Sequence, residues 1–410
     1  MAIGVISLTT PWNGGAFQYE ALMLAALGRL HLQGRHRLEF LLPMTAAGMA
    51  WIASGEMQLK GMPVRMLDAP DDSEPAGTLS AALLQRLQDR ARAPALYAAD
   101  WLFLTSPSEL GFLLGRPFVM PIHDLQHRLQ PEFPEVSNPA EFKKREFLFG
   151  NACRYAALIL VDSETGKEDV LQCYGDRIGP DRIHVLPFFP VVAARRVADP
   201  EALAAVRTRY GLPERFYFYP AQFWPHKNHV RIVEAIAQVA ARTGARMPIA
   251  LCGLYDDPNR RRHFETLMAR TAALGLDDCV KYLGYVPDED MPALYSQAVG
   301  LVMPTFFGPT NIPILEAWMC GCPTITSDIR GVREQAGGAA ILVDPRSIDA
   351  IADAMWRLWS DPESGKALAR RGTERAQYYA RTDYAALVGE VVDEVSQRVV
   401  AGRIPAPAQV

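Results

Sequence analysis

"MPTFFGPTNIPILEAWMCGCPTITS", residues 303–327, reads as a strand, a short polar loop, a helix and a second strand. The helix is built from Ile, Leu, Ala, Trp and Met, and we expect Glu316 in its first turn. This carboxylate could simply complement the helix dipole. The polar loop before the helix, with its free backbone amides, also suits an anion or a polyhydroxyl ligand. The stretch therefore predicts a binding site at the end of a strand.

Short apolar runs alternate with longer helical patterns along nearly the whole chain. Strands are expected at 3–8, 38–43, 101–104, 117–123, 157–163 and 182–190, and again at 215–222, 247–253, 279–284, 299–304, 323–327 and 339–344. Helices are expected at 17–31, 80–93, 139–154, 164–174 and 382–400. Strands separated by helical runs of ten or more residues predict parallel sheets. The predicted fold class is α/β, with two Rossmann-like doubly wound domains facing a central cleft.

A chain of 410 residues is long enough for two domains of similar size. The pattern of strands and helices breaks near residues 191–202, which we interpret as a linker. The predicted domains are therefore residues 1–190 and 197–380. A helical segment at 381–410 follows, and could cross back to the first domain.

The composition describes a soluble globular protein, with 49% apolar and 21% charged residues. The net charge of -4 gives no reason to expect a nucleic acid partner. We expect no signal peptide and no membrane-spanning segment. The six scattered cysteines indicate reduced thiols, and the expected location is the cytoplasm.

Three further polar stretches follow predicted strands. The first, Trp12-Asn13-Gly14-Gly15, could bring backbone amides close to a phosphate, although a glycine pair also ends many strands without function. In the second, His123 could exchange a proton or bind a hydroxyl, or could simply anchor the loop. His123 and His127 lack a third ligand for zinc, and no metal site is expected.

The third of these stretches, "YPAQFWPHKNH" at 219–229, carries Lys227 where a strand leads into a helix. A lysine there adds a point charge to the free amides of a helix start and suits a phosphate. The usual fate of a lysine is a solvated surface position. The neighbouring Trp224, His226 and Asn228 favour a functional interpretation.

Together these stretches resemble the retaining, nucleotide-sugar-dependent glycosyltransferases of family 4 (GT4), which have two Rossmann-like domains in the GT-B architecture. The resemblance covers nearly the whole chain. The second domain of that family carries Glu-Gly-Phe-Gly-Leu-Pro-x-Leu-Glu, where residues 308–316 here read Gly-Pro-Thr-Asn-Ile-Pro-Ile-Leu-Glu. The Arg-x4-Lys pair of the family aligns with Gln222 and Lys227. The two motifs together are similar to a bacterial polysaccharide or lipopolysaccharide-type subgroup.

The resemblance implies a role for each of these residues. Lys227 would grip the donor diphosphate, Glu316 would hold the ribose of the nucleotide, and His123 would hydrogen-bond the donor sugar. The family's first glutamate, which contacts that sugar, is replaced by Gly308, and its arginine by Gln222. The remaining expected donor contacts are Gly14, Gly15, Pro309, Thr310, Asn311 and Ile312, through backbone amides and the two polar side chains.

The resemblance also implies the reaction. A hexose, with a mannose- or rhamnose-type donor favoured, would pass with retention from a nucleotide-diphosphate sugar to a hydroxyl of a glycan or lipid-linked glycan. The first domain would bind the acceptor and the second the donor. The leaving phosphate would take the acceptor proton, and neither a metal nor a cofactor would be required.

Three alternatives stay open at this point. The absence of Glu at 308 and Arg at 222 would suit a non-catalytic nucleotide-sugar-binding subunit. A nucleotide-sugar epimerase shares the same architecture. A membrane scaffold would rest only on the basic stretches at 141–150 and 259–264, which are more often solvated helix faces. Such a segment would also suit a lipid-linked acceptor at the inner face of a membrane.

Overall fold

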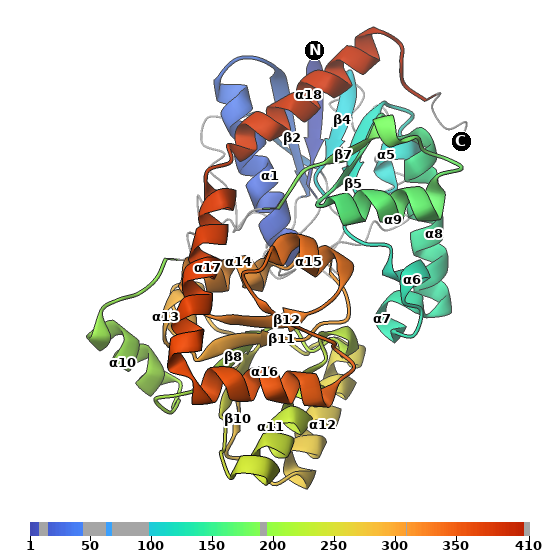
Figure 1. Cartoon of the computed structure of the whole chain (residues 1–410). Helices are drawn as coiled ribbons and strands as arrows, with labels where there is room; N and C mark the ends of the chain where they lie inside the picture. The colour runs from blue at the N-terminus through green and yellow to red at the C-terminus, as the bar shows by residue number, and fades with distance from the viewer. Residues whose placement is uncertain (8–14, 44–62, 68–97, 189–194, 309, 406–410) are drawn as a thin grey trace. The chain divides into compact units, whose positions relative to one another are not determined.

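The computed structural model describes residues 1–7, 15–43, 63–67, 98–188, 195–308 and 310–405. The chain forms two compact units (Figure 1). Unit 1 comprises Met1–Leu125, Pro139–Val191 and Asp383–Val410. Unit 2 comprises Gln126–Asn138 and Val192–Thr382. The chain therefore enters unit 2 twice. The domains predicted from the sequence are contiguous, so they assign Gln126–Asn138 to the first domain.

Unit 1 is built on a seven-stranded sheet in the order β3-β2-β1-β4-β5-β6-β7, and all of its strand pairs are parallel. Its strands are β1 (Ala2–Ile6), β2 (Arg37–Pro43), β3 (Val64–Leu67), β4 (Trp101–Leu104), β5 (Phe118–Pro121), β6 (Leu158–Val161) and β7 (Ile183–Val185). The four residues of β4, β5 and β6 are buried throughout. Strands covered on both faces read as continuous apolar runs, which is why they could be predicted. The edge strand β3 was missed.

Among the described residues, the helices of unit 1 are α1 (Gly15–Leu32), α5 (Leu110–Leu113), α8 (Pro139–Tyr155), α9 (Glu164–Tyr174), the short 3-10 helix η2 (Pro180–Arg182) and α18 (Tyr384–Val400). The last helix returns to the first sheet: α18 packs against α1, and Trp101 Nε1 donates to Ser396 Oγ at 3.3 Å. Asp393 accepts hydrogen bonds from Arg35 and His36 at 2.6 and 2.7 Å. The helix predicted at 80–93 lies outside the described residues.

Unit 2 is built on a six-stranded parallel sheet in the order β10-β9-β8-β11-β12-β13. Its strands are β8 (Tyr217–Pro220), β9 (Ile249–Cys252), β10 (Val280–Tyr282), β11 (Gly300–Met303), β12 (Thr324–Ser327) and β13 (Ile341–Val343). All six strands were predicted from the sequence. The predicted α/β class and doubly wound topology are therefore confirmed.

The helices of unit 2 are α6 (Gln126–Leu129), α7 (Pro134–Ser137), α10 (Pro200–Arg209), η3 (Pro225–Lys227), α11 (His229–Thr243), α12 (Pro258–Ala273), α13 (Met291–Gln297), α14 (Ile312–Met319), α15 (Arg330–Ala336), α16 (Ile348–Ser360) and α17 (Pro362–Ala380). In chain order this sheet reads 3-2-1-4-5-6, so the strand order reverses between β8 and β11. Ligands of open α/β sheets bind beyond the carboxyl ends of the strands at such a reversal point.

Candidate functional site

Four of the residues predicted to hold the donor follow the two strands at the reversal point of unit 2. Gln222 and Lys227 follow β8, and Gly308 and Glu316 follow β11. The two loops are joined at His226, whose carbonyl oxygen accepts from Phe306 N at 2.8 Å. The structure thus brings these four predicted positions to one edge of one sheet.

The backbone of Lys227 is fixed from both sides. The Tyr219 hydroxyl donates to the Lys227 carbonyl oxygen at 3.0 Å. The next residue, Asn228, has φ 64° and ψ 30°, a left-handed conformation in which asparagine is among the few tolerated residues. Its buried amide donates to the carbonyl oxygens of Pro304 and Pro345 at 2.9 and 2.7 Å. Lys227 therefore ends η3 at a defined place, two residues before α11 begins.

Gln222, at the arginine position of the family, is neutral and takes part in a local contact. Its Oε1 accepts from Trp224 Nε1 at 3.0 Å. The guanidinium of Arg260 lies 4.9 Å from the centre of the Trp224 ring. A cation is thus present in this region of unit 2 even though position 222 does not supply it.

The loop before α14 depends on a glycine. Gly308 has φ 127°, a conformation that L side chains rarely adopt. A Cβ at this position would lie 2.7 Å from Asn311 Oδ1. Asn311 Nδ2 donates to the Gly308 carbonyl oxygen at 3.0 Å, so the Asn311 side chain closes the loop on itself. Gln335 braces the same loop, accepting from Asn311 N at 3.0 Å and donating to Asn311 O at 2.9 Å.

Glu316 lies in the second turn of α14, and its expected place in the first turn was wrong. The helix begins at Ile312, so Glu316 is its fifth residue, and no acidic residue occupies the first turn. The residue is buried, with 8% of its surface exposed. Tyr295 OH donates to Glu316 Oε2 at 2.8 Å. Burial, followed by the negative charge of Glu316, raises the pKa of Tyr295 well above its usual range.

The other predicted donor contacts are only partly described. Thr310 is half-buried before α14, and Ile312 is the first residue of that helix. Gly15 is the first residue of α1 in unit 1. Gly14 and Pro309 lie outside the described residues.

His123, predicted to bind the donor sugar, lies in unit 1 just after β5. Its ring meets the Tyr19 ring edge to face, with centroids 4.6 Å apart. Asp124 accepts a hydrogen bond from Arg145 at 2.8 Å. Burial lowers the pKa of His123 to about 4, opposed by the charge of Asp124 and aided by that of Arg145. His123 is therefore a neutral hydrogen-bonding group at neutral pH.

This shift gives an expected result. The unfolded chain protonates His123 near pH 6.5 and the folded chain only near pH 4. Stability is therefore lost as the pH falls from about 6.5 to 4, because the unfolded state binds this proton first. NMR of the ring should show no titration of His123 between pH 5.5 and 8. A His123→Asn variant should lose less stability in the acid window, and a ring titrating near 6.5 would contradict the expectation.

Two buried carboxylates that contact the loops after the strands were missed in the sequence. Glu20 on α1 accepts from Thr105 Oγ1 at 2.9 Å and from Ser7 Oγ. Ser7 and Thr105 follow β1 and β4, where the strand order of the unit 1 sheet reverses. Glu135 on α7 contacts His226 in unit 2. A glutamate within the apolar pattern of residues 17–31 could have indicated a role for Glu20, whereas nothing in the sequence indicated one for Glu135.

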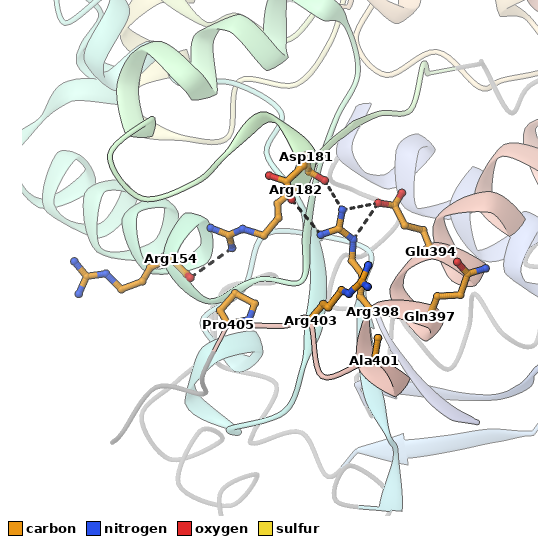
Figure 2. Close-up of a pocket in the computed structure, with 9 residues that line it drawn as sticks. All are labelled: Arg154, Asp181, Arg182, Glu394, Gln397, Arg398, Ala401, Arg403 and Pro405. Atoms are coloured by element: carbon orange, nitrogen blue, oxygen red, sulfur yellow. Dashed lines mark hydrogen bonds and ion pairs between the residues drawn. The ribbon is translucent and has the colours of Figure 1, made fainter.

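A separate pocket of about 760 Å³ lies in unit 1, away from every predicted residue (Figure 2). It is lined by Arg154, Asp181, Arg182, Glu394, Gln397, Arg398, Ala401, Arg403 and Pro405. Figure 2 shows that Asp181 and Glu394 face Arg398 within the lining. Arg182 is occupied by backbone carbonyls, those of Ala156 and Arg177 at 2.8 Å among them. Two of the four arginines thus serve internal contacts.

Two kinds of feature are absent from the part of the chain that the structure describes. Within it, no group of three or more His, Cys, Asp or Glu residues could hold a metal ion. No helix there has the length and apolar character needed to cross a bilayer. All six cysteines are free thiols, and five of them are buried.

Comparisons with known proteins indicate a family for part of the chain. Residues 207–375 match the family described as glycosyl transferases group 1. The chain is 27% identical over 232 residues to the O-antigen chain mannosyltransferase B of Escherichia coli. The aligned residues cover 55% of this chain and 57% of that protein. It is 28% identical over 271 residues to the alpha-D-kanosaminyltransferase of Streptomyces kanamyceticus, covering 64% and 66%. The chain thus spans about three fifths of the length of these curated relatives.

The fold also has solved counterparts. The crystal structure of Anabaena HepE in complex with UDP and glucose matches with a TM-score of 0.73 and 19% identity, covering 97% of this chain and 100% of that one. At this identity the match concerns the fold alone. The matched residues 207–375 contain Gln222, Lys227, Gly308 and Glu316. The family match over residues 207–375 and the sequence relatives support the GT4 glycosyltransferase that the motifs predicted, and the solved structures support its GT-B fold.

Proposed function

We propose that this chain is a retaining hexosyltransferase. It moves a hexose from a nucleotide-diphosphate sugar to a hydroxyl of a glycan or lipid-linked glycan during synthesis of a cell-surface polysaccharide. The observation that carries the proposal is the placement of Lys227 and Glu316 after β8 and β11, on either side of the reversal point. A mannose- or rhamnose-type donor is favoured, and the name of the O-antigen chain mannosyltransferase relative supports the mannose type.

The roles of the residues follow from charge and position. Lys227 supplies a positive charge to the diphosphate as it leaves, in a place fixed before the reaction begins. Glu316 accepts hydrogen bonds from the ribose hydroxyls. Neutral His123 hydrogen-bonds the donor sugar. The acceptor hydroxyl attacks the face from which the nucleotide departs, and the leaving phosphate takes its proton.

A second candidate function is a binding subunit without catalysis. It is favoured by the glycine at 308 and the glutamine at 222, where the family has a glutamate and an arginine. The two functions predict opposite results when the family's glutamate and arginine are restored. A working enzyme should then transfer sugar more slowly, and a chain that has lost its activity should regain it.

We expect the double variant Gly308→Glu and Gln222→Arg to fold but to transfer sugar roughly tenfold more slowly than the parent, because a small misplacement of the groups that position the donor lowers the rate by about tenfold or more. The added Cβ at 308 would meet Asn311 Oδ1 at 2.7 Å and disturb the loop. Nucleotide release from a panel of nucleotide-sugars, with candidate glycolipid acceptors, measures the effect. An inactive parent together with an active variant would establish the binding subunit instead.

The matched control for this experiment is Gly275→Glu. Gly275 has φ 64°, but a Cβ there would meet nothing within 4 Å. This control therefore carries the backbone strain of a glycine replacement, in the same unit, without a collision in the loop. Its transfer rate should equal that of the parent.

We also propose a cytoplasmic location with peripheral contact at the inner face of the cytoplasmic membrane. Helix α8 supports this contact, because Phe142 and Phe147 are 37% and 54% exposed beside the exposed Lys143 and Lys144. Apolar rings flanked by lysines suit an interface with anionic lipid. Cosedimentation with anionic phospholipid vesicles, compared with neutral vesicles, tests the contact.

A further inference from the structure

Position 308 cannot supply the carboxylate that the family places there without a change in the loop. Gly308 has φ 127°, and Asn311 fills the space that its side chain would need. The Asn311 amide also donates to the Gly308 carbonyl oxygen. The conformation of the loop therefore favours glycine at 308. A carboxylate that stabilises this loop would come from another part of the chain.

A segment from the first half of the sequence packs against this loop. We call it the strap: residues Gln126–Asn138, which hold α6 and α7 and belong to unit 2 (Figure 1). Phe133 of the strap lies 5.1 and 5.5 Å, between ring centroids, from Phe306 and Phe307. Gln130 Nε2 donates to the Phe306 carbonyl oxygen at 3.0 Å. The strap therefore contacts the two residues that precede Gly308.

The strap also brings a buried carboxylate to the Lys227 loop. Glu135 Oε1 lies 2.7 Å from His226 Nδ1 and accepts from His226 N at 3.0 Å. The two side chains are 4% and 10% exposed. With Glu135 ionised, Nδ1 donates the hydrogen bond, because a carboxylate only accepts. Charge-assisted contacts of this kind, shielded from water, hold a side chain firmly.

His226 passes this constraint to both donor loops. Its carbonyl oxygen accepts from Phe306 N at 2.8 Å and from Thr305 Oγ1 at 3.3 Å. Its ring stacks on Phe307 with centroids 3.8 Å apart. Lys227 is the next residue. A shift of His226 would therefore move Lys227 and the chain leading to Gly308 together.

We propose that Glu135 is a positioning residue of the donor site. Through His226 it holds the Lys227 loop against the Thr305–Gly308 loop. A carboxylate from the strap thus stabilises the region where the family uses a glutamate at 308. This inference rests on the proposed function, because it assigns the two loops to a nucleoside diphosphate.

The test is a double-mutant cycle on the full chain. Glu135→Ala, His226→Ala and the double variant are titrated with UDP, GDP and dTDP by calorimetry, and the diphosphate that the parent binds most tightly is then used throughout. We expect each single variant to weaken binding about tenfold, and the double variant to weaken it about tenfold as well. Residues that act as one unit give such non-additive effects, whereas independent residues would give about a hundredfold.

Two controls separate positioning from general stability. Val136→Ala, in the same strap, removes packing against Phe306 and Phe307 without touching His226. Glu132→Ala removes a half-exposed strap carboxylate whose partner, Arg346, lies 3.6 Å away. Melting temperatures are measured for all variants. The Val136 variant should lose stability but keep nucleotide affinity, and the Glu132 variant should keep both.

Glu135→Gln guards against a variant that fails to fold. Glutamine keeps the size and an oxygen that accepts from His226 N, so it should retain more affinity than alanine. Equal affinity in the parent and the Glu135 variants overturns the inference and leaves the proposed function intact. An equal loss in the Val136→Ala variant overturns it too, since packing alone then explains the effect. A parent that binds none of the three diphosphates overturns the proposed function and this inference with it.

Discussion

Replacing Lys227 with alanine should leave the chain folded and lower the rate of sugar transfer by about two orders of magnitude or more. That range is typical when one charged partner of the transition state is removed from a preorganised site. The backbone at 227 is held by the Tyr219 hydroxyl, the left-handed Asn228 and the carbonyl of His226, none of which needs the lysine side chain. The loss should therefore fall on the reaction and not on the fold.

The measurement is nucleotide release from the preferred donor in the presence of acceptor, together with the melting temperature. Lys281→Ala is the matched control, because Lys281 is exposed on β10 in the same unit. It should transfer sugar at the parental rate. A Lys227→Ala variant with near-parental turnover and an unchanged melting temperature would remove Lys227 from the site.

Replacing Glu316 with glutamine should weaken binding of the free nucleoside diphosphate about tenfold and the nucleotide-sugar by a similar factor. Hydrogen bonds to a charged group contribute on the order of 1.5–3 kcal/mol, and neutral ones about 1 kcal/mol. Glutamine keeps the shape and can still accept from Tyr295 OH. The change therefore removes only the charge of Glu316, which we assign to binding of the ribose.

Tyr295→Phe is the control for this prediction. It removes the hydrogen bond of 2.8 Å to Glu316 Oε2 while leaving the carboxylate in place. Its effect on nucleotide affinity should be smaller than that of Glu316→Gln. Loss of acceptor affinity alone in the Glu316 variant, with normal nucleotide binding, would contradict the assignment.

The strand pattern made much of the fold predictable. Buried parallel strands such as β4 and β6 read as unbroken apolar runs, and their boundaries lie within a few residues of those expected. The edge strand β3 was missed because its four residues include Arg65, which interrupts the run. The place of Glu316 was wrong by one turn. Pro313, which fits the first turn of a helix, could have indicated where α14 begins.

The candidate site was predictable only where it follows from local sequence. The loops after β8 and β11 carry recognisable motifs, and parallel strands bring their carboxyl ends to one edge. The contact between Glu135 and His226 joins residues 91 apart in the sequence. Nothing near Glu135 in the chain indicates that contact, because it depends on the strap packing in unit 2. Tertiary packing of this kind leaves no periodic signal.

The return of α18 to unit 1 has a consequence for the chain while it is being synthesised. A ribosome adds about 5–20 residues per second, so roughly 200 residues between β7 and α18 take about 10–40 s. Until then α1 lacks the helix that packs against it, including the hydrogen bond from the Tyr384 hydroxyl to Met23 Sδ. Unit 2 can be complete before unit 1 is, and the nascent protein exposes an apolar helix face throughout that interval.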